Sequence, residues 1–152
     1  PARRAARSSG AAAAQLRLDR LPVHLAAAVP FRELPHLRED LRLLLDARLA
    51  SRRYLFGTTF VETDWRLFVT LVRFDAVYHG HFKCNIRRII DYPNLFGYLK
   101  DLYQTDGVAD TVNFDHIKRH YYLTHGEINP TGIVPLGPDQ DLTASHGREH
   151  LA

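Results

Sequence analysis

The chain has 152 residues and a mass of 17.4 kDa, with 45% hydrophobic residues, 24% charged residues and a formal net charge of +3. This length suits one globular domain, and 11% aromatic residues exclude a wholly disordered chain. Apolar runs stay well short of the roughly 20 residues of a membrane span, and the single cysteine, Cys84, cannot form an internal disulfide. We therefore expect a cytoplasmic protein with no membrane partner.

The charge is divided unevenly along the chain. Residues 1–50 hold nine arginines and five acids, a net charge of +4, whereas residues 51–152 hold 11 Lys or Arg and 12 acids, a net charge of −1. The aromatic part is thus not basic, and no nucleic-acid partner is expected. Residues 1–35 form an Arg/Ala-rich leader that we expect to be disordered or not native: a flexible or targeting segment, or DNA translated out of frame. Residues 36–152 form the expected domain.

Two helices are predicted in the first half of this domain. Leucines recur at helical spacing over 36–50. The stretch 62–78, ETDWRLFVTLVRFDAVY, is too long for an ordinary strand and places apolar residues on more than one face, which predicts a central, buried helix. Its charged residues Arg73 and Asp75 must find partners if they are buried.

The second half is predicted to contain helices and an extended tail. A short helix fits within 79–92, and Pro93 opens a helix over 93–104. Helical spacing returns over 110–123, where Asn113 or Asp115 is expected to cap the last helix, and a helix-free tail rich in Pro and Gly follows. Helices without credible strand pairs indicate an all-α bundle.

Two clusters have a chemical and an ordinary interpretation. His116 and His120 lie four residues apart, the spacing of two ligands for one metal, but no third ligand is evident and exposed helix histidines explain them as well. Cys84 lies near His79 and His81, which can activate a thiolate, but a buried structural cysteine is the alternative.

A third cluster, Lys118 to Tyr122, combines cations with aromatic rings. Such groups can stack a planar ligand, and the two tyrosines can line a pocket for a phenolic substrate or pack in the core. Signatures of nucleotide-binding loops, serine hydrolases and CxxC redox sites do not occur in the sequence.

From Arg53 to about Arg148, a series of motifs follows in a characteristic order: RYLFG, TDWRLFVTLVRFDAVYHGHFKCN, DYPNL, DLYQ, GVADTVN, HIKRHYY, INPTGIVPLGP and HGR. In these motifs the chain closely resembles the C-terminal domain of glutathionyl-hydroquinone reductases, the Xi-class, omega-like glutathione transferases. The resemblance implies a transferase-type helical bundle with an extended tail.

The resemblance implies that in this family the helical domain packs against a thioredoxin-like domain. That second domain carries the glutathione site and a catalytic cysteine in a Cys-Pro-Trp-Ala-like motif. This sequence contains neither, and Cys84 matches the FKCN motif instead, so no catalytic residue is expected in this chain. Glutathione is the implied co-substrate and an aromatic glutathionyl-hydroquinone the substrate, with no metal. A homodimer is also implied. A non-catalytic, transferase-like helical module for protein interactions is the alternative.

The same resemblance suggests residues of the substrate wall. Tyr121 and Tyr122 of the HYY motif are the first candidates, and their hydroxyls can donate hydrogen bonds to the substrate oxygen. His125, Arg73 and Trp65 are candidates because they lie in matching motifs.

The sequence departs from the family pattern in two places. Val61 stands where transferases favour a Ser or Thr N-cap three residues before the Asp of the central helix, here Asp64. Loss of such a cap costs about 0.5–2 kcal/mol, so either Thr58 or Thr59 caps the helix earlier or this end of the helix stays weak. In addition, residues 1 to about 44 lack the family's aromatic helices, which is consistent with a truncated or out-of-frame opening.

Overall fold

The computed structural model describes residues 34–151, with side chains from Glu39 onward. Residues 1–33, most of the predicted leader, lie outside the described residues. The described part contains helices and no strand, which confirms the all-α prediction. The α-helices are α2 (Leu34–Leu49), α3 (Glu62–Arg73), α4 (Pro93–Tyr103) and α5 (Phe114–Thr124). A π-helix (Phe74–Tyr78) prolongs α3, and single 3-10 turns cover Ile89–Asp91, Ala109–Thr111 and Glu149–Leu151.

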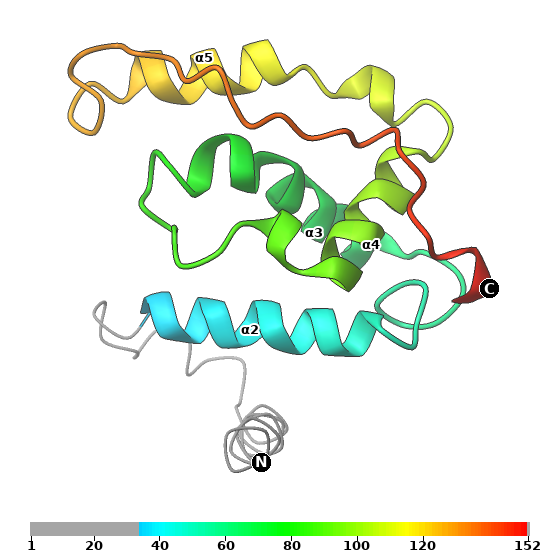
Figure 1. The fold of residues 1–152 in the computed structure, drawn as a ribbon. Coiled ribbons are helices and arrows are strands. Elements are labelled where there is room, and N and C mark those ends of the chain that lie inside the picture. Colours follow the sequence, from blue (N-terminus) through cyan, green and yellow to red (C-terminus); the bar gives the residue numbers. More distant parts are fainter. Residues whose placement is uncertain (1–33, 152) are drawn as a thin grey trace.

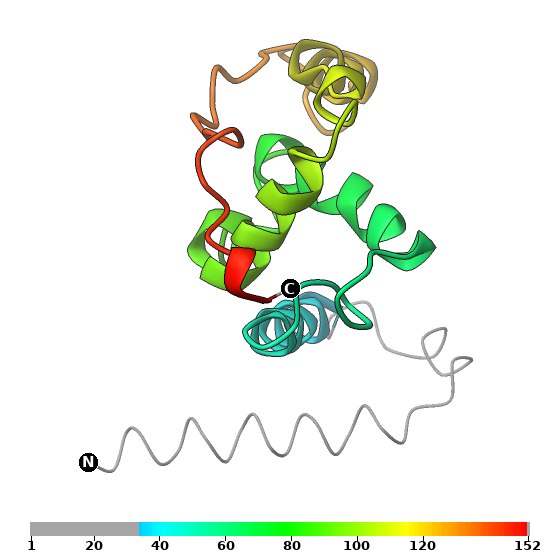
Figure 2. The same cartoon turned by 90° about the vertical axis from the view of Figure 1, so that its right-hand side faces the viewer.

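The helices form three layers (Figure 1). α2 lies on one side, α3 and α4 lie in the middle, and α5 lies on the opposite side, so that α2 and α5 are both seen nearly end-on in the turned view (Figure 2). The tail after α5 runs back across the bundle toward the end of α2. None of these helices is long and apolar enough to cross a bilayer.

The core lies around α4, which packs against α2 and against α3. Its fully buried side chains come from the end of α2, from residues 89–92 and from α4, and they include Leu49, Ile89, Tyr92, Leu95, Tyr98 and Leu102. A large apolar side chain buried in this way contributes about 1.5–3 kcal/mol, so this cluster is the main source of stability.

The start of α3 shows how the chain manages without a Ser or Thr cap. The carboxylate of Asp64 is fully buried and accepts hydrogen bonds from the amides of Val61 (2.8 Å) and Leu55 (3.0 Å) and from the hydroxyl of Tyr98 (2.7 Å). The Asp64 amide donates to the Val61 carbonyl at 2.9 Å. The backbone of Val61 therefore satisfies the amide that a side-chain cap would bind, and the expectation of an earlier threonine cap was wrong.

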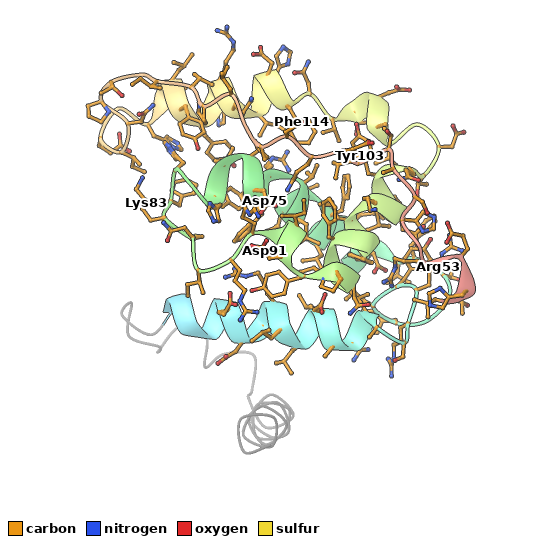
Figure 3. The ribbon with its side chains drawn as sticks, in the orientation of Figure 1. Arg53, Asp75, Lys83, Asp91, Tyr103 and Phe114 are labelled. Carbon is orange, nitrogen blue, oxygen red and sulfur yellow. The ribbon has the colours of Figure 1, made fainter. Side chains whose placement is uncertain are left out.

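The end of α3 widens into the π-helix, so the predicted helix over 62–78 is confirmed but is not α-helical throughout. Asp75 points from this turn toward the Ile89–Asp91 segment (Figure 3). Its carboxylate accepts hydrogen bonds from the amides of Ile89 (2.6 Å) and Ile90 (3.2 Å) and from the side chain of Gln140. Asp75 thus has the partners that its position requires.

The remaining predictions hold with two corrections. α4 begins at Pro93, and the amides of Asn94 and Leu95 donate to Asp46 of α2 at 2.9 and 2.8 Å. Asn113 caps α5 by accepting from the amide of residue 116 at 3.0 Å. The helix expected within 79–92 is only the Ile89–Asp91 turn, and the tail ends in a further 3-10 turn.

The tail is fastened by Arg148, which is 3% exposed. Its guanidinium donates to four backbone carbonyls, those of Leu49 (3.1 Å), Asn94 (3.2 Å), Arg52 (2.5 Å) and Arg53 (2.8 Å). These carbonyls lie at the end of α2, in the chain after it and at the start of α4, so one side chain joins three parts of the bundle.

Candidate functional site

A groove of about 590 Å³ lies between α2, α3 and the segment that follows the π-helix. Its walls are mainly apolar. The lining residues are Leu41, Arg42, Leu45, Leu67, Thr70, Leu71, Phe74, Tyr78, Phe82, Cys84, Ile89 and Tyr121. An apolar groove with few polar groups is typical of a site for a small aromatic ligand.

Two of the polar groups in this groove are phenols that meet each other. Tyr78 is the last residue of the π-helix, and Tyr121 reaches the groove from α5. Their hydroxyl oxygens are 3.4 Å apart, and their rings meet edge to face with centroids 5.8 Å apart. Burial, with the hydrogen bond to Tyr121, raises the pKa of Tyr78 to about 12. Tyr78 therefore keeps its proton at neutral pH and can donate a hydrogen bond.

Phe82 completes this aromatic edge of the groove. Its ring centroid is 5.8 Å from that of Tyr78 and 5.8 Å from that of Tyr121. The side chain is 40% exposed, so Phe82 lies where the groove opens to solvent. The three rings together form a polarisable aromatic wall.

Tyr122 and His125 lie next to this wall but do not line the groove. The Tyr122 ring packs edge-on against the imidazole of His81, with centroids 4.7 Å apart. A Cβ atom on Gly80 would lie 3.1 Å from the Tyr122 hydroxyl, so a larger residue there would have to displace this hydroxyl by a few tenths of an ångström. His125 Nδ1 lies 3.1 Å from His81 Nε2.

The structure places the other two predicted site residues elsewhere. Arg73 lines a separate cavity of about 220 Å³ between α3 and α5, and its guanidinium donates to the Val69 carbonyl at 2.5 Å. Trp65 lies in the first turn of α3, where its ring packs edge-on against Phe60 and Phe68 with centroids 5.2 and 6.0 Å away. The five candidates therefore do not form one site.

The clusters with a possible metal or thiolate chemistry are also separated. His116 lines the smaller cavity, whereas the ring of His120 lies beside Tyr121. Among residues 34–151, no three His, Cys, Asp or Glu side chains converge as a metal site would require. Cys84 lines the groove, while His81 faces His125.

Sequence reasoning missed Tyr78 and Phe82 as site residues. The sequence pattern marks Tyr78 only as the end of a buried helix and does not single out Phe82. The signal that could have found them is the run of aromatic residues around Gly80, where a buried helix ends. That these rings meet the HYY segment depends on a contact between residues 43 apart in the chain.

Comparison with known proteins gives a consistent result. The family model for the glutathione S-transferase C-terminal domain matches residues 13–101. The chain is 56% identical over 105 residues to the glutathionyl-hydroquinone reductase YqjG of Escherichia coli, a match that covers 69% of this chain and 32% of that protein. It is 56% identical over 98 residues to the glutathionyl-hydroquinone reductase PcpF of Sphingobium chlorophenolicum, covering 64% and 31%. The chain thus spans about a third of the length of these relatives.

Solved structures show the same likeness. The glutathione-bound structure of E. coli YqjG matches with a TM-score of 0.75 and 51% identity, over 78% of this chain and 38% of that chain. A Xi-class transferase from Natrialba magadii matches with a TM-score of 0.69 and 49% identity, over 75% and 37%. The resemblance found in the sequence is confirmed, and the chain belongs to the glutathione S-transferase C-terminal domain family.

Proposed function

We propose that this chain forms the substrate-binding wall of a glutathione-dependent reductase that removes glutathione from glutathionyl-hydroquinones. The observation that carries the proposal is the apolar groove with the Tyr78 and Tyr121 hydroxyls 3.4 Å apart at its edge. The groove is large enough for a substituted aromatic ring. The names of the two reductases at 56% identity support the same substrate class.

In the proposed reaction, a cysteine of a thioredoxin-like domain attacks the glutathionyl sulfur. The carbon–sulfur bond breaks, the ring carbon takes up a proton, and the cysteine is left in a mixed disulfide with glutathione. A second glutathione thiolate then attacks that disulfide, which releases oxidised glutathione and restores the cysteine. This chain holds one cysteine, Cys84, and no Cys-Pro-Trp motif, so its own residues bind and orient the ring.

The tyrosine pair has a defined role in this proposal. As the carbon–sulfur bond breaks, negative charge develops on the ring and its oxygen. Tyr78, protonated because its pKa is about 12, and Tyr121 donate hydrogen bonds to that oxygen. The apolar wall excludes water, which strengthens these hydrogen bonds.

We propose Tyr121 as the substrate contact among the residues named from the sequence. Tyr122 and His125 lie next to Tyr121 and support it, while Arg73 and Trp65 receive no contact with substrate because they lie outside the groove. We assign no residue of this chain to glutathione itself. The homodimer stays a prediction.

A binding titration tests the proposal on the chain itself. Methylhydroquinone, which represents the aromatic part of the product, should shift the NMR signals of the Tyr78 and Tyr121 rings. Tyr121→Phe should weaken binding about three- to tenfold, the worth of one hydrogen bond. Tyr103→Phe is the matched control, because Tyr103 packs against the core at the end of α4 and does not line the groove.

Turnover provides the second test. The chain joined to the thioredoxin-like domain of a reductase of this family should release hydroquinone from a glutathionyl-hydroquinone when glutathione is added. A folded fusion without this activity, or equal affinity of wild type and Tyr121→Phe for methylhydroquinone, would contradict the proposal.

A further inference from the structure

A pair of histidines joins the ends of two helices beside the groove. His81 follows the π-helix at the end of α3, and His125 is the residue after α5. His81 Nε2 and His125 Nδ1 are 3.1 Å apart, a hydrogen-bond distance. This contact links two segments that are 44 residues apart in the chain.

The surroundings of His81 determine which nitrogen carries its proton. The side chain is 2% exposed, and its Nδ1 atom is buried without a hydrogen-bond partner. Phe82 and Tyr122 pack edge-on against the imidazole, with centroids 4.8 and 4.7 Å away. A hydrogen on Nδ1 would be a buried N–H group without an acceptor, whereas a hydrogen on Nε2 meets Nδ1 of His125. We therefore assign the hydrogen to Nε2 of His81, with Nδ1 of His125 as its acceptor.

The same pair fixes the position of the phenols. His81 lies three residues after Tyr78, and its amide donates to the Val77 carbonyl at 2.8 Å, which keeps the segment continuous with the helix. On the other side, the ring of His125 packs edge-on against that of Tyr121 with centroids 5.6 Å apart. The hydrogen bond between the imidazoles thus bridges the segment that carries Tyr78 and the end of the helix that carries Tyr121.

We propose that His81 is a positioning residue for the Tyr78–Tyr121 pair, and that its hydrogen bond to His125 holds only while both imidazoles are neutral. A proton added to the pair has two places to go. Between the rings it would put two N–H groups face to face at 3.1 Å, and on His81 Nδ1 it would be buried without an acceptor. Mild acid therefore breaks the bridge and lets Tyr121 move away from Tyr78. The role of this bridge in catalysis rests on the proposed function, in which Tyr78 and Tyr121 bind the substrate oxygen.

The charged groups around the pair favour the neutral form. Burial lowers the pKa of His81 below its ordinary value of 6.5, and the nearby His125 and Lys83 lower it further, while Glu127 acts in the opposite direction. Lys83 lies in the loop beyond the end of α3, at the same end of the bundle (Figure 3).

On the α5 side, the ring of His120 lies near that of His125, with centroids 6.4 Å apart. The rings of Tyr121 and Tyr122 pack edge-on against that of His81. Because the folded state resists protonation of His81, its contribution to stability is complete above about pH 6.5 and is lost as the pH falls below that value.

NMR of the full chain tests the inference between about pH 5 and pH 8, the range in which histidine titrates. At pH 8, ¹⁵N shifts should show His81 protonated at Nε2 and bare at Nδ1. As the pH falls, the ring signals of Tyr121 should change with the same midpoint as the His81 nitrogens. A protonated Nδ1 at pH 8, or Tyr121 signals that do not follow His81, would overturn the inference.

Two variants separate positioning from packing. His81→Leu removes the donor, and it should displace the Tyr121 signals at every pH and weaken methylhydroquinone binding about three- to tenfold at pH 8. His81→Gln places an amide donor near the position of Nε2, and it should restore most of the affinity without the transition in mild acid. His150→Gln changes an exposed histidine of the last 3-10 turn and should behave as wild type.

The outcomes distinguish the two proposals. If wild type does not bind methylhydroquinone at any pH, the proposed function fails, and the Tyr121 and His81 signals still decide the inference. If His81→Leu keeps wild-type Tyr121 signals and affinity, the inference fails. If His81→Leu loses its helical circular dichroism because it does not fold, the pH titration of wild type and the affinity of His81→Gln test the inference instead.

Discussion

Replacing Asp64 by Ala should destabilise the bundle more than any surface change. Its fully buried carboxylate serves three donors: the amides of Leu55 and Val61 and the hydroxyl of Tyr98. Each buried donor left without an acceptor costs about 1–3 kcal/mol. The alanine variant no longer buries a carboxylate, which offsets part of the cost of the three unpaired donors. We therefore expect a loss of about 3–5 kcal/mol in the free energy of unfolding. That is a large fraction of the roughly 5–15 kcal/mol of a typical domain.

Urea unfolding followed by far-ultraviolet circular dichroism measures this loss. Tryptophan fluorescence is unsuitable because Trp65 is adjacent to the mutated residue. Asp64→Asn keeps one acceptor oxygen and should cost less than Asp64→Ala, and Tyr98→Phe removes only one donor and should cost about 1 kcal/mol. Asp115→Asn, at an exposed position of α5, should change stability by less than about 0.5 kcal/mol. A loss below about 1 kcal/mol for Asp64→Ala would refute the reasoning.

Two further predictions concern close packing and acid. Gly97→Ala should lower the thermal midpoint, because a Cβ there would lie 2.9 Å from the backbone carbonyl of His146, whereas Gly126→Ala, with nothing within 4 Å, should not. Glu39 is pushed toward a higher pKa by burial, but hydrogen bonds, first that from Tyr92, outweigh this and hold its pKa below the ordinary 4.5. Its stabilising effect is therefore present above about pH 4.5 and lost as the pH falls further, so Glu39→Gln should be less stable than wild type in urea unfolding at pH 7 and approach it in strong acid. A constant difference between the two at all pH values would contradict this assignment.

The helices could be predicted because their signals are local. The spacing of Leu, Val and Phe predicts α3 and α4 with ends that differ by only a few residues from those observed, and Pro93 marks the first residue of α4. Asn113 was a correct cap candidate because an N-cap acts within four residues of itself.

The contacts that fix the fold could not be predicted, because their partners are distant in the sequence. Asp46 binds the start of α4, which lies 48 residues later, and Asp75 binds amides 14 and 15 residues away. At Val61, sequence reasoning counted side-chain caps only and missed that a backbone carbonyl can serve the same amide.

The candidate site was predicted in part for the same reason. Tyr121 lies in a motif that points to a substrate wall, so it was named from the sequence. Tyr78 was not named, because the π-helix decides which face of its segment enters the groove, and no residue spacing reveals that widening. Trp65 shares a motif with Tyr78 but lies at the opposite end of α3, where it packs against Phe60.

Arg148 has a consequence for the order in which the molecule assembles. Three of the carbonyls it binds are 95–99 residues earlier in the sequence, and the fourth is 54 residues earlier. Closing loops of this length costs chain entropy that only an already assembled α2–α4 unit can repay. We therefore expect the guanidinium to bind after the folding nucleus has formed, so that it lengthens the lifetime of the folded state by slowing unfolding and does not speed folding.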